Sequence, residues 1–204
     1  IKNNFSITGD YEAVNYKYWT YDWRVSFDKA ERYNSWDSKG YKKRFFKIAG
    51  SIFPNDNLKL KSEFRVKKEK EWLNWIVDNN LAVYDLNQRI ISFDLNWFKG
   101  NKHEIRLKSQ FVALEAKKPR ALFSKNDGTL LNLDKEINSF SNGITSFQIR
   151  YRYELAPLSN IYLVYTKGGN VYEEDDERSF SNILKDPWNN PDNEILSLKF
   201  RLKY

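Results

Sequence analysis

The chain has 204 residues and a mass of 24.4 kDa, and its 34 Lys and Arg against 27 Asp and Glu give a net charge of +7. This length suits a single domain. A mean hydropathy of −0.75 and the lack of a long apolar run exclude transmembrane helices, but not membrane-spanning strands. The absence of cysteine excludes disulfides, thiolate metal sites and cysteine nucleophiles.

Apolar and polar residues alternate with period two in six stretches of the chain. In chain order these are 19–27, 58–67, 91–97, 104–113, 147–155 and 196–204. Such alternation is typical of strands with one apolar and one charged face. We count eight strands from about residue 17, each of about 9–13 residues, and a candidate ninth in Phe5–Asn15. The pattern predicts an all-β protein.

Short and long connections alternate between these strands. Pro, Gly or Asn mark tight turns at 54–57, 99–102 and 156–160. Long polar links, expected to be surface loops, lie near 30–40, 71–87, 116–143 and 169–193. If every strand reverses direction, the short turns gather at one end of the sheet and the long loops at the other, as in outer-membrane barrels.

The predicted fold is therefore an antiparallel up-and-down transmembrane β-barrel formed by residues 1–204 as a single domain. The chain either closes by itself or forms the C-terminal part of a larger barrel. Because the chain also lacks methionine, we expect it to be a mature or excised piece.

The charged face of these strands is mostly basic. Lys and Arg cannot face lipid without a cost of about 2–4 kcal/mol each at the midplane, so we expect them to line a water-filled lumen. An excess of positive charge there favours anionic ligands over cations. Five acidic residues share the face: Asp22, Glu63, Asp94, Glu104 and Glu154. The predicted basic lumen residues are Lys59, Lys61, Arg65, Lys67, Arg106, Lys108, Arg150, Arg152, Lys199, Arg201 and Lys203.

Aromatic residues divide into two groups. Those on apolar stripes near strand ends are expected at the membrane–water interface; they are Trp19, Trp23, Trp97, Tyr151 and Tyr153. Three tryptophans in the long links, Trp72, Trp75 and Trp188, either stack on a sugar ring or anchor the packing of the loops. The aromatics do not interleave with basic residues on one face, which argues against a nucleic-acid surface.

Catalytic and metal-binding patterns are lacking in the sequence. The only histidine, His103, has no nearby Cys or second His, so we interpret it as an interfacial side chain beside a turn. The acidic run Glu173–Glu177 is either a solvated loop or a Ca²⁺ ligand set, and it lacks the spacing of a dedicated calcium loop. We expect no enzyme activity, no metal and no cofactor.

The stretch from Phe64 to Tyr204 resembles a known bacterial domain. The residues that carry the resemblance are Arg65–Leu73, Asp94–Phe98, His103–Lys108, Ile149–Ser159 and Ile161–Tyr165. The stretch resembles the C-terminal barrel, a domain of unknown function, of large outer-membrane proteins with an N-terminal module similar to family 9 carbohydrate-binding modules. The resemblance implies a larger barrel and no catalytic residues, and this chain lacks the N-terminal module.

The C-terminal segment Leu196–Tyr204 resembles the signal by which the barrel-assembly machinery recognises its clients. Its residues would be Leu198, Phe200, Leu202 and Tyr204, and its physical content is an amphipathic edge strand. An ordinary terminal strand is the alternative.

We therefore expect an outer-membrane barrel of a Gram-negative bacterium, with a role in transport or in surface anchoring and assembly, linked to anionic glycan handling. Its expected partners are outer-membrane lipid, lipopolysaccharide and the assembly machinery, with no nucleic acid. A surface-attached soluble β-sandwich that binds glycans is the alternative hypothesis, and an outer-membrane hydrolase using loop carboxylates is a remote one.

Overall fold

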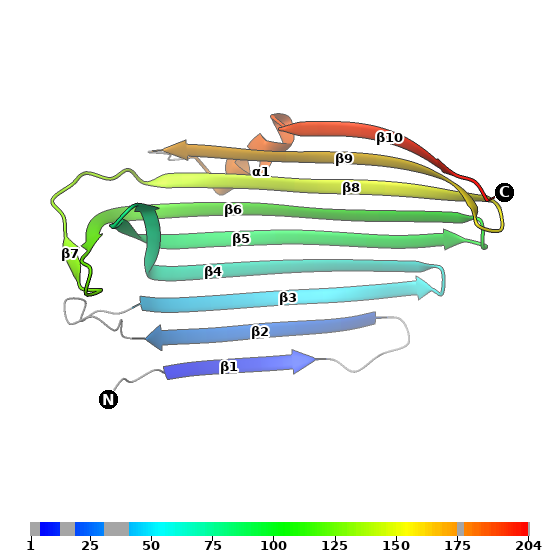
Figure 1. Ribbon diagram of the computed structural model, residues 1–204. Helices are drawn as coiled ribbons and strands as arrows, with labels where there is room; N and C mark the ends of the chain where they lie inside the picture. The colour runs from blue at the N-terminus through cyan, green and yellow to red at the C-terminus, as the bar shows by residue number, and fades with distance from the viewer. Residues whose placement is uncertain (1–4, 13–18, 31–40, 175–177, 204) are drawn as a thin grey trace.

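The computed structural model describes residues 5–12, 19–30, 41–174 and 178–203. Its main feature is one antiparallel up-and-down sheet in which neighbouring strands follow the chain order, β1-β2-β3-β4-β5-β6-β8-β9-β10, with the short β7 paired to β6 (Figure 1). The elements are β1 Phe5–Glu12, β2 Trp19–Ala30, β3 Tyr41–Asn55, β4 Leu58–Val77, β5 Asn80–Lys99, β6 His103–Ser124, β7 Leu130–Asn132, β8 Phe140–Ala156, β9 Ser159–Glu174, α1 Phe180–Asn189 and β10 Asn193–Arg201.

The predicted all-β, up-and-down arrangement is confirmed, including eight long strands from residue 19 onwards and a further strand, β1, before them. The strands are longer than expected, because β4 and β5 have 20 residues each and β6 has 22. A strand of 9–11 residues suffices to cross the hydrocarbon of a membrane. About half of each long strand is therefore additional length.

The two ends of the sheet differ in their connections. Tight turns join β3 to β4, β5 to β6 and β8 to β9 at one end, as predicted (Figure 1, right). Gly100 and Leu158 there adopt positive φ values of 56° and 66°. We call the half of the sheet next to these turns the turn-side half. The opposite half, next to the longer connections, is the loop-side half.

The prediction of long links was wrong for 71–87 and partly wrong for two others. Residues 71–87 form the ends of β4 and β5, which meet in a tight turn at Asp78 and Asn79. This tight turn lies at the same end of the sheet as the longer connections, so the predicted separation of short turns from long links is also wrong at this end. Residues 116–143 include the end of β6, β7 and the start of β8, and residues 169–193 include the end of β9 and helix α1. In the link at 30–40, residues 31–40 lie outside the described residues.

The sheet is open. β1 and β10 form its two edges, and no pairing between them occurs in the described part of the chain. Each of the eight successive pairings in the main path is antiparallel, so β1 and β10 run in the same direction. An antiparallel barrel with an even number of strands would therefore require at least one more strand between them.

Buried side chains gather in the loop-side half. One cluster contains Tyr84, Ala82 and Ala116, with Trp72 and Phe140 packed against it. The ring of Tyr84 meets that of Phe140 edge-on at 5.1 Å between centroids. A second cluster of Val83, Leu122 and Leu130 lies under β7.

Helix α1 lies against β8 and β9 of the loop-side half. Gly143 and Gly169 leave the space that the helix occupies, and we call this pair the glycine seat. A Cβ on Gly143 would lie 2.1 Å from the carbonyl oxygen of Ile183, and a Cβ on Gly169 would lie 2.1 Å from that of Pro187. Pro187 has no N–H, so it leaves the carbonyl of Ile183 without the usual helical donor. This carbonyl lies against Gly143.

Candidate functional site

The strand register places almost all of the predicted lumen residues on one face of the sheet. In antiparallel pairs, residues directly opposite share a face, and the register therefore links Lys59, Asn96, Arg106, Arg150 and Val164 across five strands. Ten of the eleven basic residues lie on this surface, which we call the charged face. The eleventh, Lys203, follows β10, and its backbone N–H donates to the hydroxyl of Ser159 at 3.1 Å.

Glu104 is the centre of the charged face. It is only 3% exposed, and three guanidinium groups surround its carboxylate. Arg106 pairs with it along β6, while Arg150 and Arg152 reach it from β8 at 3.1 and 2.9 Å. One buried carboxylate thus holds three arginines whose side chains remain partly in contact with water.

A second ion-pair group lies on β3 and β4. The carboxylate of Glu63 pairs with Arg65 on its own strand and lies 3.9 Å from the ammonium of Lys47 on β3. Lys67 pairs with Glu69 at 2.9 Å. The sequence pattern did not predict that Lys47 lies on the charged face, because the adjacent Phe45 and Phe46 interrupt the alternation in β3.

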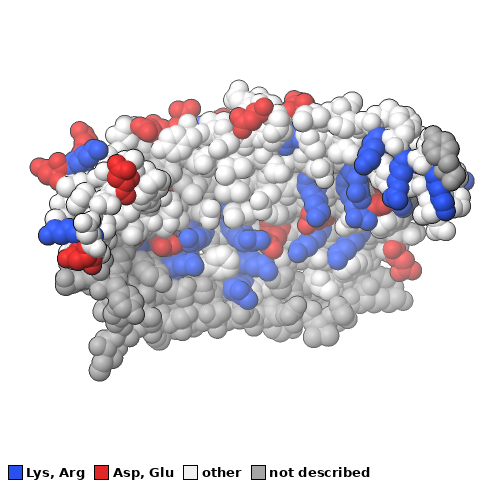
Figure 2. Space-filling view, viewed as in Figure 1, with Lys and Arg blue, Asp and Glu red and all other residues white. Residues whose placement is uncertain are grey.

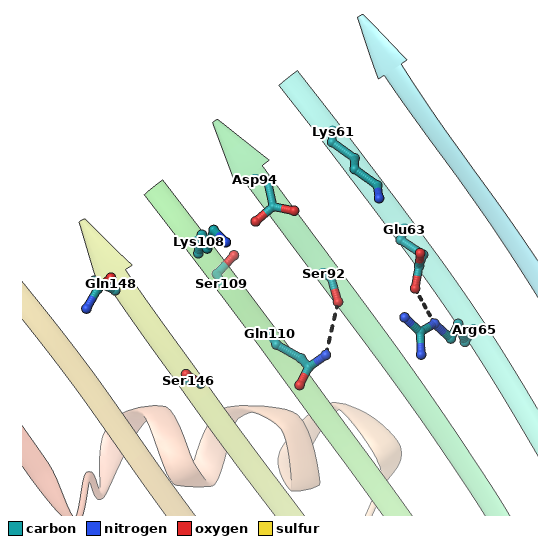
Figure 3. Close-up of a pocket in the computed structure, with 10 residues that line it drawn as sticks. All are labelled: Lys61, Glu63, Arg65, Ser92, Asp94, Lys108, Ser109, Gln110, Ser146 and Gln148. Carbon is teal, nitrogen blue, oxygen red and sulfur yellow. Dashed lines mark hydrogen bonds and ion pairs between the residues drawn. The ribbon is translucent and has the colours of Figure 1, made fainter. Parts of the chain in front are cut away.

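A shallow hollow of about 450 Å³ lies on the charged face between β4 and β8 (Figure 3). Its charged residues are Lys61, Glu63, Arg65, Asp94 and Lys108, three basic and two acidic. Polar side chains complete its wall, among them Gln110, whose amide donates to the hydroxyl of Ser92 at 3.4 Å. The hollow is polar and nearly balanced in charge.

A second hollow of about 520 Å³ lies between β8 and β10 and has no acidic residue in its lining. Arg150, Lys199 and Arg201 give it three positive charges, and Tyr162 and Ser197 contribute hydroxyl groups. No carboxylate pairs with Lys199 or Arg201 within the part of the chain that the structure describes. Figure 2 shows Lys and Arg side chains gathered over the turn-side half of this face.

The opposite face of the turn-side half is apolar and exposed. We call it the apolar belt, and its rows run across β3 to β10. The belt includes Ile48, Ile52, Leu60, Phe64, Phe93, Leu95, Leu107, Ile149, Leu163, Leu196 and Leu198. Leu196 remains 69% exposed. Contiguous exposed apolar surface of this kind marks an interaction with a membrane or another protein.

The predicted interface aromatics lie on the same face as the belt, near the turn-side ends of their strands. Trp19 and Trp23 are opposite Ile52 and Ile48, and Trp97 is opposite Ile105. Tyr151 pairs its hydroxyl with Nδ1 of His103 at 2.7 Å. The His103 ring also lies 5.0 Å from that of Tyr153.

The three loop tryptophans have different surroundings. Trp188, on α1, lies edge-on to Phe147 at 5.5 Å and beneath the ammonium of Lys167 at 4.7 Å, so it anchors the helix. Trp72 belongs to the buried cluster around Tyr84. Trp75 is 64% exposed, and its indole N–H donates to the carbonyl of Asp78 at 2.9 Å.

The predicted assembly signal lies on the edge strand β10 and just beyond it. Leu198 and Phe200 are exposed and lie opposite Leu163 and Ile161. Leu202 follows the strand, and Tyr204 lies outside the described residues. The edge of β10 that faces away from β9 has no partner strand among the described residues.

In the loop-side half, the face that carries the belt becomes polar, and the other face becomes more apolar. The sequence pattern did not predict this change. On the face that carries the belt, the rows continue as Arg44, Lys68, Asn87, Glu115 and Ser141. On the other face, β5, β6 and β8 become largely apolar at Leu86, Leu114, Ala116 and Phe140. On that face β4 keeps the charged residues Lys67 and Glu69. The belt therefore ends halfway along the strands.

Neither protein-family models nor curated proteins show a match to this chain. Among the described residues, no group of His, Cys, Asp or Glu side chains could hold a metal ion, although Asp175, Asp176 and Glu177 of the acidic run are outside them. No helix in the described ranges is long and apolar enough to cross a membrane.

Proposed function

We propose that this chain is part of an outer-membrane β-barrel of a Gram-negative bacterium, whose charged face lines a water-filled interior. The observation that carries the proposal is the pairing of an exposed apolar belt with a charged face on opposite sides of the same strands. A lipid-facing exterior and a polar interior require this arrangement.

The length of the belt supports the proposal. On β4 it runs from Leu58 to Val66, and on β5 from Ile91 to Trp97. These spans of about nine and seven residues approach the 9–11 that a tilted strand needs to cross the hydrocarbon. Beyond them the same face becomes polar at Lys68 and Arg89, as expected for strands that continue into water.

The open edges favour a larger barrel, of which the described part of this chain supplies the nine strands of the main path. Unpaired backbone groups are costly in hydrocarbon, so the free edge of β10 must meet another strand in the membrane. Its apolar residues would also face lipid and the barrel-assembly machinery during insertion. Outer-membrane lipid, lipopolysaccharide and this machinery are the proposed partners.

The role we propose is transport, or surface anchoring and assembly, with a preference for anionic solutes such as carboxylated or sulfated glycans. The hollow of Arg150, Lys199 and Arg201 supports this preference, since confined positive charge raises the local concentration of anions. The complete barrel in a planar bilayer would then show anion preference in a salt gradient. Lys199→Glu with Arg201→Glu should weaken that preference.

Cysteine labelling tests the membrane topology directly, because the chain has no cysteine of its own. Ile149→Cys lies on the apolar belt, and Gln148→Cys, its neighbour on β8, lies on the charged face. In phosphatidylcholine vesicles that hold the complete barrel, we expect a water-soluble maleimide to label the cysteine at 148 and to leave the one at 149 unmodified. After solubilisation and unfolding, both should react.

Equal labelling of the two cysteines in vesicles would contradict the proposal. A chain that stays folded and monomeric in plain buffer, with both sites accessible, would favour the soluble glycan-binding hypothesis instead. The exposed Trp75 would then be the residue to test for sugar binding.

A further inference from the structure

A compact group of basic residues lies on the belt side of the loop-side half. Arg44 on β3 is directly opposite Lys68 on β4, and in the next row Lys42 is opposite Lys70. Lys29 on β2 takes the register position opposite Lys42. We call these five residues the basic block. The side chains of Arg44, Lys68 and Lys70 are exposed.

The basic block is electrostatically unfavourable in the chain alone. Like charges directly opposite each other destabilise a strand pair, and two successive rows here have this arrangement. In the described part of the chain, no carboxylate pairs with Arg44, Lys68 or Lys70. On the charged face of the same strands, by contrast, Lys47 and Lys67 both have acidic partners. The block therefore lacks the compensation that its neighbours have.

The position of the block coincides with the end of the apolar belt. Phe46 and Val66, opposite each other, form the last apolar row on β3 and β4, and Arg44 and Lys68 form the next row. In a barrel whose long loops face outwards, this row lies at the headgroup level of the outer leaflet. Phosphate groups of anionic lipids lie at that level.

We propose that the basic block binds the phosphate groups of an anionic glycolipid in the outer leaflet. This inference rests on the proposed membrane topology. A phosphate among the exposed side chains of Arg44, Lys68 and Lys70 would accept charge-assisted hydrogen bonds from both β3 and β4, and Arg44 can bind it in bidentate fashion. The ligand thereby supplies a negative charge that the described residues do not place beside Arg44, Lys68 and Lys70.

The test compares two variants of equal charge in the full chain. The first carries Arg44→Gln, Lys68→Gln and Lys70→Gln, and the control carries Lys59→Gln, Lys61→Gln and Lys108→Gln on the charged face. Binding of diphosphoryl lipid A is measured by native mass spectrometry from neutral detergent. The thermal midpoint is measured in phosphatidylcholine vesicles with and without that lipid.

We expect the block variant to bind the lipid at least about tenfold more weakly, a difference of about 1.4 kcal/mol, and the control to bind like the unmodified chain. The lipid should raise the thermal midpoint of the unmodified chain and of the control only. Without the lipid, the block variant should be at least as stable as the unmodified chain, because like-charge repulsion has been removed.

Unchanged lipid binding in the block variant would overturn the inference, and so would an equal loss in both variants, which would indicate a response to net charge alone. Equal stabilisation by soluble inorganic phosphate would refute the lipid as the source. A complete barrel that fails to insert, as judged by labelling at 148 and 149, would refute the membrane topology itself. A barrel that inserts but binds the lipid no better than the block variant does would refute only the proposed binding of lipid phosphate by the basic block.

Discussion

The turn-side and loop-side halves are built from the same strands but differ in how apolar and charged side chains are distributed over the two faces. In the turn-side half, alternation separates an apolar belt from a face held by ion pairs around Glu104 and Glu63. In the loop-side half, both faces are mixed, side chains are buried around Tyr84, and α1 covers part of the sheet. The difference indicates two environments along one strand.

On the belt face the change occurs within two residues on β4, β5 and β8. On β5 the belt face passes from Ile91 to Arg89, and on β8 from Phe147 to Thr145. On β5, β6 and β8 the other face changes from polar to apolar at nearly the same level, at Ile90, Val112 and Ile144. Such a change is expected of a strand that, as proposed above, leaves a membrane and continues into water. The substitutions below test how different the two halves are.

The largest effect should come from Glu104→Gln in the turn-side half. Among the described residues, Glu104 is the only acidic residue that pairs with Arg106, Arg150 and Arg152, and the substitution removes its charge. Breaking a buried ion pair costs about 3–5 kcal/mol, and the partial exposure of the arginines places the expected loss near 3 kcal/mol. Urea unfolding of the inserted chain in vesicles measures it.

The matched change in the loop-side half is Glu115→Gln. Glu115 accepts a hydrogen bond from the amide of Asn87 and pairs with the half-exposed Lys117 at 3.0 Å. The glutamine keeps an acceptor oxygen for Asn87, so the loss should stay below about 1 kcal/mol. Equal losses of unfolding free energy for Glu104→Gln and Glu115→Gln would mean that ion pairs stabilise the two halves to the same extent.

A local effect, smaller than that of Glu104→Gln, is expected from Gly143→Ala. The new Cβ would lie 2.1 Å from the carbonyl oxygen of Ile183 and 2.8 Å from Cγ of Pro187, so α1 must move away. Overpacking of this kind costs about 1–3 kcal/mol. Hydrogen exchange in 180–189 should become faster, while exchange in β4 and β5 of the turn-side half should not change.

Gly50→Ala is the control in the turn-side half, since its Cβ would meet only the carbonyl oxygen of Thr20 at 3.5 Å, an ordinary contact. It should leave exchange in 180–189 unchanged. If Gly143→Ala also leaves α1 protected, the glycine seat is not what positions the helix.

The turn-side half could be predicted from the sequence because one rule governs it. Alternation and the turn residues are local, so the tight turns and the charged residues of both β6 and β8 followed directly from the residue order. What alternation could not predict was closure, since it contains no information about which edges meet.

The loop-side half was harder to predict because its local signals conflict. Residues 72–77, with Trp72, Trp75 and Val77, do not alternate, and the register shifts between Glu69 and Trp72, where Glu71 has a φ of 59°. The segment therefore resembled a loop. Helix α1 was missed because Pro187 lies inside it and its position depends on two glycines in distant strands.

The smallest predicted effect concerns Asp127, in the turn between β6 and β7 of the loop-side half. The backbone N–H of Thr129 donates to the carboxylate of Asp127 at 2.9 Å, and this bond, aided by the Thr129 side chain and the charge of Lys125, lowers the pKa of Asp127. Because the pKa is lowered, the hydrogen bond stabilises the turn fully at pH values above the ordinary pKa of the carboxyl group. That stabilisation is lost as the pH falls through the lowered value.

The amide proton shift of Thr129, followed by NMR from neutral to strongly acidic pH, should therefore change in one step below the ordinary pKa of aspartate. Asp127→Asn keeps an acceptor oxygen and should abolish the step while preserving the turn. A step at or above the ordinary pKa would show that the bond does not favour the charged form. Because Asp127 is fully exposed, neither the titration nor the substitution should alter the unfolding of the turn-side half, which confines this pH response to one end of the sheet.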